Sequence, residues 1–295
     1  MTVRSVLADP FLELDAEVGE SPTWDALHQR YLCVDITRGA VFSFGASGAV
    51  LSKYSTGDHI GAALPTTTED LLLVTRTGFS TLNPAGELTE LLTVHSDPRI
   101  RFNDAKTDPH GAVLAGTMPY QPTTPPAGSL FRFAEGAPLE TLRTGVGLSN
   151  GLGWSPDGGT LYFVDSTTQS IQAFPYQPHG TLGDPATIAH IPAEDGMPDG
   201  ICVDDDGCIW VALFGGGVVR RYTPDGRIDT IVELPVSQPT SCAFGGADGS
   251  QLVITTAAFR LTEEERRKQC YAGAVFTVTP GVTGRPAYPW NHQGA

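Results

Sequence analysis

The segment SNGLGWSPDGGTLYFVDSTTQSIQAF, residues 149–174, carries the pattern that decides the fold. Asn150 stands near its start, Trp154 follows four residues later, and Gly158 follows after eight. Short apolar and β-branched runs lie on either side of a Pro-Asp-Gly turn, without the three-to-four residue period of a helix. The segment therefore predicts antiparallel strands joined by tight turns.

The same frame occurs in both directions along the chain. Asn103 precedes Asn150 by 47 residues and Asp199 follows it by 49, and each is again followed by a glycine after eight residues, Gly111 and Gly207. A strand-like run comes directly after each of these three glycines: AVLAGTM after Gly111, GTLYFVDS after Gly158 and CIWVALF after Gly207. Repeats of this length, with turn glycines between short strands, predict a β-propeller in which each repeat forms one blade.

About six blades account for the chain, so we predict an all-β, six-bladed propeller. Glu20 holds the frame position of the first blade, with Trp24 four residues later, and Thr240 holds that of the last. The second blade has Ala62 and Ala63 there. No linker or change of composition interrupts the sequence, so residues 1–295 are expected to form one domain.

Four segments carry further structural predictions. The prolines of residues 119–127 predict a loop at the rim, and LTEEERRKQC, residues 261–270, predicts a helical turn inside blade six. Residues 4–14 are expected to pair into the last blade and close the ring, which hides strand edges. Residues 204–207, Asp-Asp-Asp-Gly, predict a solvated hairpin turn.

Composition limits the possible partners. A formal net charge of −15 argues against nucleic acid and anionic membranes as partners, because both require a basic face. No apolar run is long enough for a signal peptide or a membrane span, and the five cysteines form no C-x-x-C pair. We therefore expect a cytoplasmic protein with reduced thiols and a small-molecule substrate. The sequence does not specify the oligomeric state.

Only the innermost strand of each blade lines the channel of a propeller, so residues in one register converge on its axis. Glu20, Asn103, Asn150 and Asp199 would bring carboxylate and amide oxygens together there, which favours one hard divalent cation. Calcium is the first expectation, magnesium or manganese would fit the same ligands, and zinc could bind in vitro. Ser149 lies in a G-x-S-x-G motif, but no helix follows, so it is not expected to be a nucleophile.

Five ordered motifs resemble the gluconolactonase and regucalcin (senescence marker protein) family over almost the whole chain. They are Gly19-Glu20-Ser21-Pro22 with Trp24; Arg101-Phe102-Asn103-Asp104 with Lys106, Asp108 and Ala115-Gly116-Thr117-Met118; Ser149-Asn150-Gly151-Leu152 with Trp154; Pro198-Asp199-Gly200; and Pro239-Thr240-Ser241 with Phe244-Gly245-Gly246. Members of this family are six-bladed propellers with a divalent cation in the channel.

The resemblance implies that Glu20, Asn150 and Asp199 bind the metal directly. It also implies that Asn103 lies beside the metal, where it acts on the metal, its water or the substrate, and that Arg101 contacts the substrate. Sugar-lactone hydrolases of the family often carry a carboxylate in the loop after Thr117-Met118. Here that loop reads Pro119-Tyr120-Gln121, with no acid before Glu135, so Tyr120 and Gln121 are the residues expected to bind substrate.

The function expected from these residues is metal-dependent opening of a lactone. A cation would polarise the carbonyl oxygen, and Asp199 is the expected general base because it is one of two carboxylates in the set. Two alternatives remain open at this point. The same centre could hydrolyse a phosphoester or tailor a natural product, or the propeller could bind calcium or a protein without catalysis.

Overall fold

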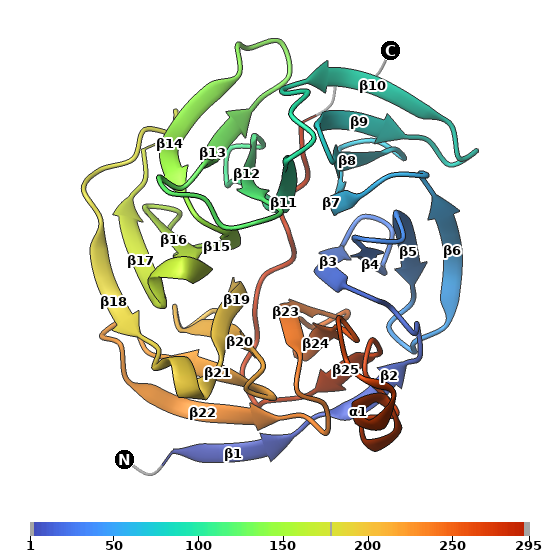
Figure 1. Ribbon diagram of the computed structural model, residues 1–295, viewed down its shortest axis with the longest axis vertical. Helices are drawn as coiled ribbons and strands as arrows, with labels where there is room; N and C mark the ends of the chain where they lie inside the picture. Colours follow the sequence, from blue (N-terminus) through green and yellow to red (C-terminus); the bar gives the residue numbers. More distant parts are fainter. Residues whose placement is uncertain (1–2, 178, 292–295) are drawn as a thin grey trace.

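The computed structural model describes residues 3–177 and 179–291, which form six sheets arranged around a central channel (Figure 1). Blades one to three consist of β3 (Gly19–Asp25), β4 (Arg30–Asp35), β5 (Ala40–Phe44) and β6 (Val50–Ser55); β7 (Ile60–Pro65), β8 (Leu71–Thr75), β9 (Gly78–Leu82) and β10 (Leu88–Thr93); and β11 (Ile100–Thr107), β12 (Val113–Pro119), β13 (Gly128–Phe133) and β14 (Glu140–Val146).

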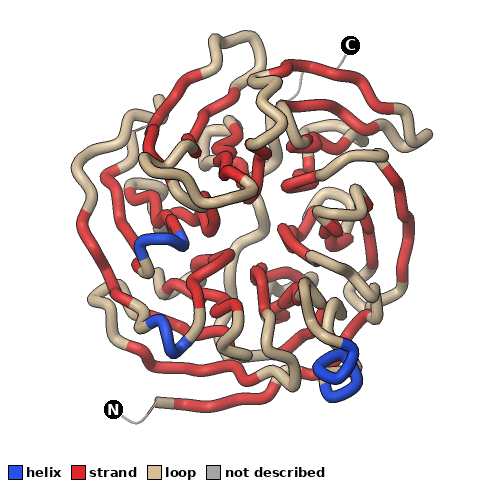
Figure 2. The backbone as a smooth tube through the Cα atoms, in the orientation of Figure 1, coloured by secondary structure: helices blue, strands red, loops and turns tan. Residues whose placement is uncertain are grey.

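Blades four to six consist of β15 (Ser149–Trp154), β16 (Thr160–Asp165), β17 (Ser170–Pro175) and β18 (Ala186–His190); β19 (Met197–Val203), β20 (Ile209–Phe214), β21 (Val218–Tyr222) and β22 (Ile228–Glu233); and β23 (Pro239–Gly245), β24 (Gln251–Thr256) and β25 (Val275–Val278). Strands make up nearly all the regular structure (Figure 2). Helical segments in the described residues are short: η1 (Ser166–Thr168), η2 (Ala193–Asp195) and α1 (Glu263–Lys268). The predicted six-bladed propeller is confirmed.

The ring closes differently from the prediction for residues 4–14. Strand β2 (Asp9–Leu12) pairs antiparallel with β25 and completes blade six, as expected. Strand β1 (Arg4–Leu7) instead pairs parallel with β22 and becomes a fifth strand of blade five. Blade six needs only one further strand, so the preceding residues cover the outer edge of the neighbouring blade, which would otherwise be unpaired.

Apolar clusters lie between the blades. Each of the six buried clusters joins residues from two neighbouring blades, and the cluster of Trp24, Tyr31 and Phe42 with Val253 and Val275 joins the first blade to the last. Burial of this surface, at about 25 cal/mol per Å², holds the ring closed.

In the described residues no helix is long and apolar enough to cross a membrane. All five cysteines are free thiols, and only Cys270 is exposed.

Three expected segments lie where the sequence placed them. Residues 120–127 form the loop between β12 and β13, while Pro119, the first residue of the predicted loop, ends β12. Helix α1 interrupts blade six between β24 and β25 with a Thr262–Glu265 capping box. Residues 204–207 form the turn between β19 and β20. The expectation that this turn is solvated is wrong for Asp204.

Asp204 is buried because it satisfies several donors at once. Its Oδ2 accepts hydrogen bonds from Trp210 Nε1 at 2.8 Å and Arg221 Nε at 2.7 Å, and its Oδ1 accepts from the backbone N–H groups of Asp206 and Cys208. Only 1% of Asp204 is exposed. The carboxylate thus ties the turn to the second and third strands of blade five.

After β25 the chain crosses one end of the channel (Figure 1). Bridges join Asp204 to Gly284 and Thr66 to Trp290, so this segment connects blade five to blade two. Trp290 is fully buried and stacks on Phe133 at a centroid distance of 5.7 Å. The C-terminal segment therefore covers the end of the channel that lies away from the starts of the inner strands.

Candidate functional site

The inner strands have an irregular register at their frame positions. Register shifts occur between Glu20 and Thr23 in β3, between Phe102 and Ala105 in β11, between Ser149 and Leu152 in β15, and between Pro198 and Ile201 in β19. A β-bulge leaves a residue unpaired and redirects its side chain. The four predicted cation-site residues, Glu20, Asn103, Asn150 and Asp199, all lie in or beside these bulges.

The glycines next to the frame residues allow neighbouring inner strands to approach closely. A Cβ atom on Gly151 would lie 2.7 Å from the carbonyl oxygen of Asp199, and one on Gly61 would lie 2.1 Å from that of Asn103. No side chain fits at these positions without moving the next strand. The Asn150-Gly151 pair therefore serves close backbone approach rather than a turn.

All seven predicted site residues line one cavity of about 440 Å³ at the mouth of the channel, where the inner strands begin. They are Glu20, Arg101, Asn103, Tyr120, Gln121, Asn150 and Asp199. They come from blades one, three, four and five, and blade six adds Thr240, whose hydroxyl donates to the carbonyl oxygen of Gly19 at 2.5 Å. The tertiary structure thus assembles residues that span 180 positions, from Glu20 to Asp199 inclusive.

Three buried carboxylates lie close enough to affect one another. Burial, followed by the charge of Asp104, raises the pKa of Glu20 to about 8. The pKa of Asp199 is also raised well above its usual value by burial, by Glu20 and by Asp104. Each of these side chains is at most 6% exposed. Like charges in a buried site favour either protonation or a bound cation.

The amide side chains form a chain of hydrogen bonds between blades. Asn103 Nδ2 donates to Asn150 Oδ1 at 2.6 Å and to the carbonyl oxygen of Ser149 at 2.8 Å. Asn150 Nδ2 donates to Ser166 Oγ at 2.8 Å, and Ser166 Oγ donates to the carbonyl oxygen of Pro198 at 2.6 Å. This chain fixes Asn150 between blades three and five, with its Oδ1 facing Asn103.

Arg101 is held beside the carboxylates. Its Nη1 donates to Asn103 Oδ1 at 2.6 Å and to the carbonyl oxygen of Phe102 at 2.9 Å, and its guanidinium lies 5.9 Å from the centre of the Tyr120 ring. Burial lowers the pKa of Arg101, whereas Tyr120, Glu20 and Asp199 raise it. The guanidinium is therefore positioned to bind an oxygen atom of a ligand in the cavity.

His59 is a cavity residue that the sequence analysis missed. Its Nδ1 lies 2.7 Å from Tyr120 Oη, and burial lowers the pKa of the imidazole. The repeat contained a signal for it, because His59 stands two residues before Gly61 as Arg101 stands two before Asn103. Blade two therefore contributes to the cavity from the position two residues before its bulge, and the bulged residue is Gly61 rather than the expected Ala62 or Ala63.

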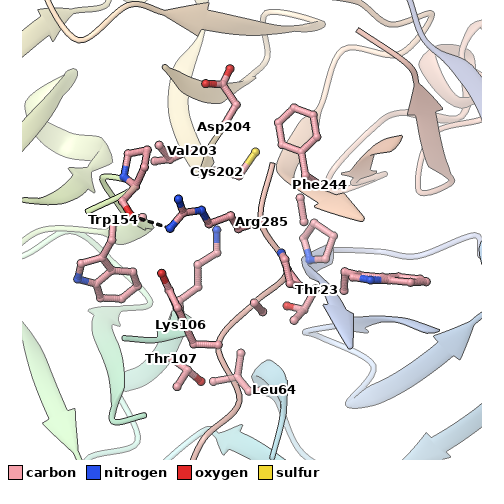
Figure 3. A pocket seen from close by; sticks show the side chains of 18 of the residues that line it. Thr23, Leu64, Lys106, Thr107, Trp154, Cys202, Val203, Asp204, Phe244 and Arg285 are labelled. Atoms are coloured by element: carbon pink, nitrogen blue, oxygen red, sulfur yellow. Dashed lines mark hydrogen bonds between the residues drawn. The ribbon is translucent and has the colours of Figure 1, made fainter. Parts of the chain in front are cut away.

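A separate, smaller cavity of about 100 Å³ lies at the opposite end of the channel (Figure 3). Lys106 of β11 and Arg285 of the C-terminal segment both line it. Lys106 Nζ donates to the carbonyl oxygen of Ile201, two blades away, and its charge lowers the pKa of both Glu20 and Asp104. Lys106 thus spans the channel below the carboxylates and partly balances their charge.

Ser149 does not have the surroundings of a nucleophile. The residue is fully buried, and its Oγ has no hydrogen-bond partner among the described residues. It continues into a strand, β15, rather than a helix. A serine nucleophile requires an adjacent base and an exposed position, so the motif reflects strand packing.

The residues at the mouth fit a hard cation. Glu20 Oε2 accepts a hydrogen bond from the backbone N–H of Ser21 at 2.7 Å, which orients the carboxylate. The set offers two carboxylates and the Oδ1 of Asn150, all oxygen donors. Among the described residues, no three acidic, histidine or cysteine side chains form a metal-binding group without amides. The oxygen atoms of Glu20, Asn150 and Asp199 are of the kind that suits calcium, magnesium or manganese better than zinc.

The fold and this arrangement define a class: six-bladed propellers with converging carboxylates and amides at one end of the channel. Residues 18–258 match the family model described as the SMP-30/Gluconolactonase/LRE-like region. The chain belongs to this family, which confirms the resemblance seen in its five motifs. The match begins just before Glu20 and extends beyond Thr240, so it includes every frame residue.

Relatives match over most of the chain. Regucalcin of Gallus gallus is 35% identical over 284 residues, covering 92% of this chain and 94% of that protein. A Bacillus subtilis protein named "Putative sugar lactone lactonase YvrE" is 32% identical over 288 residues, covering 96% and 98%. The crystal structure of a calcium-binding protein, regucalcin, from Agrobacterium tumefaciens superposes with a TM-score of 0.92 at 27% identity, covering 99% and 100%.

Proposed function

We propose that this protein is a divalent-metal-dependent hydrolase that opens a lactone, a small cyclic ester. The observation that carries the proposal is the cavity at the channel mouth, which is lined by a partly buried arginine, two amides and two carboxylates with raised pKa values. Membership in a family that includes gluconolactonases supports this reaction class. The substrate is a small molecule.

Glu20, Asn150 and Asp199 would hold the cation, with calcium the first expectation. When bound there, the metal supplies Lewis-acid polarisation of the lactone carbonyl oxygen. Asn103 keeps the Asn150 amide in place through its 2.6 Å hydrogen bond and lies within reach of the substrate. A residue that orients a metal ligand in this way contributes strongly to metal affinity.

Asp199 is the proposed general base. Its carboxylate would accept a proton from the attacking water, because it is one of the two carboxylates of the proposed site. Arg101 donates hydrogen bonds to the carbonyl oxygen, on which negative charge develops, and then to the new carboxylate. The alcohol oxygen that leaves the ring takes the proton, which completes hydrolysis to a hydroxy acid.

Tyr120 and Gln121 are proposed to contact the substrate from the rim. Both are exposed and line the cavity, and the hydrogen bond from Tyr120 to His59 keeps the phenol ring next to Arg101. The ring can pack against one face of a lactone, while the Gln121 amide can donate or accept a hydrogen bond.

We also propose a cytoplasmic location, on the basis of five free cysteines.

The direct test is an assay of the purified protein with a panel of lactones, linear esters and phosphoesters, each with calcium, magnesium, manganese or zinc in excess. Lactone opening that disappears with a chelator and returns with one of these metals supports the proposal. Turnover of phosphoesters alone would replace it with phosphoester hydrolysis at the same centre.

A second candidate function is calcium binding without catalysis. The likeness to a calcium-binding regucalcin favours it. Calorimetric titration of the metal-stripped protein separates the two candidates when combined with the assay. Calcium binding with no turnover of any panel member would support this second function and overturn the first.

A further inference from the structure

The residues two positions before the frame form a second layer above the proposed cation site. In blades one, four and five these residues are Val18, Leu148 and Met197, two before Glu20, Asn150 and Asp199. In blade three this residue is Arg101, and in blade two, where Gly61 is the bulged residue, it is His59. All five line the cavity. The layer is therefore polar over blades two and three and apolar over the blades that carry the three proposed ligands.

Further apolar side chains extend the apolar half outward. Phe214 is the cross-strand partner of Met197 in blade five, Phe259 follows β24 in blade six, and both line the same cavity. Val18, Leu148, Met197, Phe214 and Phe259 are all only partly buried, so each presents apolar surface to the cavity. A concave apolar wall beside a few fixed polar groups is the usual form of a site for a ligand with an apolar part.

Most polar groups around the mouth already bond to the protein. Tyr120 Oη and His59 Nδ1 bond to each other, Thr37 Oγ1 donates to Asp35 at 3.2 Å, and Thr240 Oγ1 donates to Gly19. Gln121 and Arg260 are exposed at the rim. A ligand with many hydroxyl groups would lose hydrogen bonds to water on entering the apolar half, and a buried hydroxyl without a partner is unfavourable.

We infer that the substrate is a lactone that carries an apolar substituent, such as an alkyl chain, rather than a polyhydroxylated sugar lactone. This inference rests on the proposed lactonase function. The carbonyl faces Arg101 and Asn103 on the polar side, and the substituent lies against Leu148, Met197 and Phe214. Because the proposed metal ligands and the apolar wall belong to the same blades, one orientation of the lactone places its carbonyl at the cation site and its substituent against the wall.

The test compares γ-lactones with alkyl substituents of increasing length against glucono-δ-lactone, with the metal-loaded protein. Each methylene that enters the apolar half is expected to raise kcat/KM about fourfold until the wall is filled, which corresponds to ~0.8 kcal/mol per methylene. A glucono-δ-lactone rate above that of every alkyl lactone would overturn the inference but leave lactonase activity established. If neither class is opened, the proposed function itself fails, and the inference with it.

Two cavity variants test whether Met197 and Phe214 form the apolar wall. Met197→Gln keeps a side chain of similar length and is expected to reduce the gain per methylene from about fourfold to about twofold. Phe214→Tyr, which adds only a hydroxyl, should reduce it in the same direction and serves if the first variant fails to fold. Leu51→Gln, on the outer strand β6 where Leu51 is 60% exposed, is the control and should leave the gain unchanged. An unchanged gain in both cavity variants would contradict the assignment.

Discussion

Asn103 and Asn150, 47 residues apart in sequence, are joined by a 2.6 Å hydrogen bond from Nδ2 of the first to Oδ1 of the second. The bond links the inner strands of blades three and four. It uses one lone pair of Asn150 Oδ1 and leaves the other for a ligand. The orientation of a proposed metal ligand thus depends on a residue of the neighbouring blade.

Removal of that hydrogen bond should weaken cation binding. We expect Asn103→Ala to lower calcium affinity by about 10- to 100-fold, because Asn150 then loses the partner that orients its amide. Calorimetric titration of the metal-stripped variant measures the effect. Asn83→Ala, in a turn of blade two where Asn83 bonds Glu87, is the control and should bind like the original protein. Equal affinity in both variants would show that Asn103 does not position the ligand.

Asp199 should be essential for turnover. Asp199→Ala is expected to lower kcat for lactone opening by at least ~100-fold with metal in excess, since general bases contribute about 10² to 10⁴. Asp225→Ala provides a matched control, because Asp225 lies in another Pro-Asp-Gly sequence but bonds Thr223 and Arg227 at the surface, away from the cavity. Full activity of the Asp199 variant would remove this residue from the mechanism.

The metal-free protein should lose stability as pH rises. The pKa of Glu20 is about 8 in the folded protein and 4.5 without its surroundings, so the folded state binds this proton more tightly. The resulting stabilisation is complete below pH 4.5 and is lost as pH rises through about 8. Thermal unfolding of the chelator-treated protein should therefore occur at a lower temperature at pH 9 than at pH 6.

Glu20→Gln isolates the contribution of this carboxyl group. The variant has no proton to lose, so its unfolding temperature should fall less between pH 6 and pH 9 than that of the original protein. Asp199 shifts in the same direction and accounts for part of the remaining fall. If the two proteins show the same decrease, the proton on Glu20 does not contribute to the stability of the metal-free form.

Substitution of Arg221 should lower the free energy of unfolding far more than substitution of Arg227, another arginine of blade five. Its guanidinium bonds Asp204, Asp206 and Asp229 at 2.6–2.8 Å, and Asp204 is buried. We expect Arg221→Met to cost about 3–5 kcal/mol, because a buried carboxylate loses its charged partner. Urea unfolding measures this.

The exposed pair between Arg227 and Asp225 supplies the comparison. Both side chains are more than 60% exposed, so Arg227→Met should change the free energy of unfolding by less than ~1 kcal/mol. A similar cost for the two variants would mean that the burial of Asp204 does not govern the effect.

Much of the site was predictable because a propeller repeats a local pattern. The eight-residue spacing from Asn103, Asn150 and Asp199 to a turn glycine placed these residues at one end of the channel, and the structure brings them into one cavity with Glu20. His59 was missed even though its place in the repeat matches that of Arg101. Its partner Tyr120 lies 61 residues away, and nothing in the local sequence indicates that contact.

The sequence alone therefore determined the strand and turn pattern, the number of blades and the register of the frame residues, since these follow from spacing within each repeat. Only the tertiary structure decided the division of the N-terminal strands between two blades, the burial of Asp204 and the course of the C-terminal segment across the channel. Strand edges are covered, charges are paired and surfaces are filled by whichever residues lie nearest in space, and circular closure places distant parts of the chain side by side.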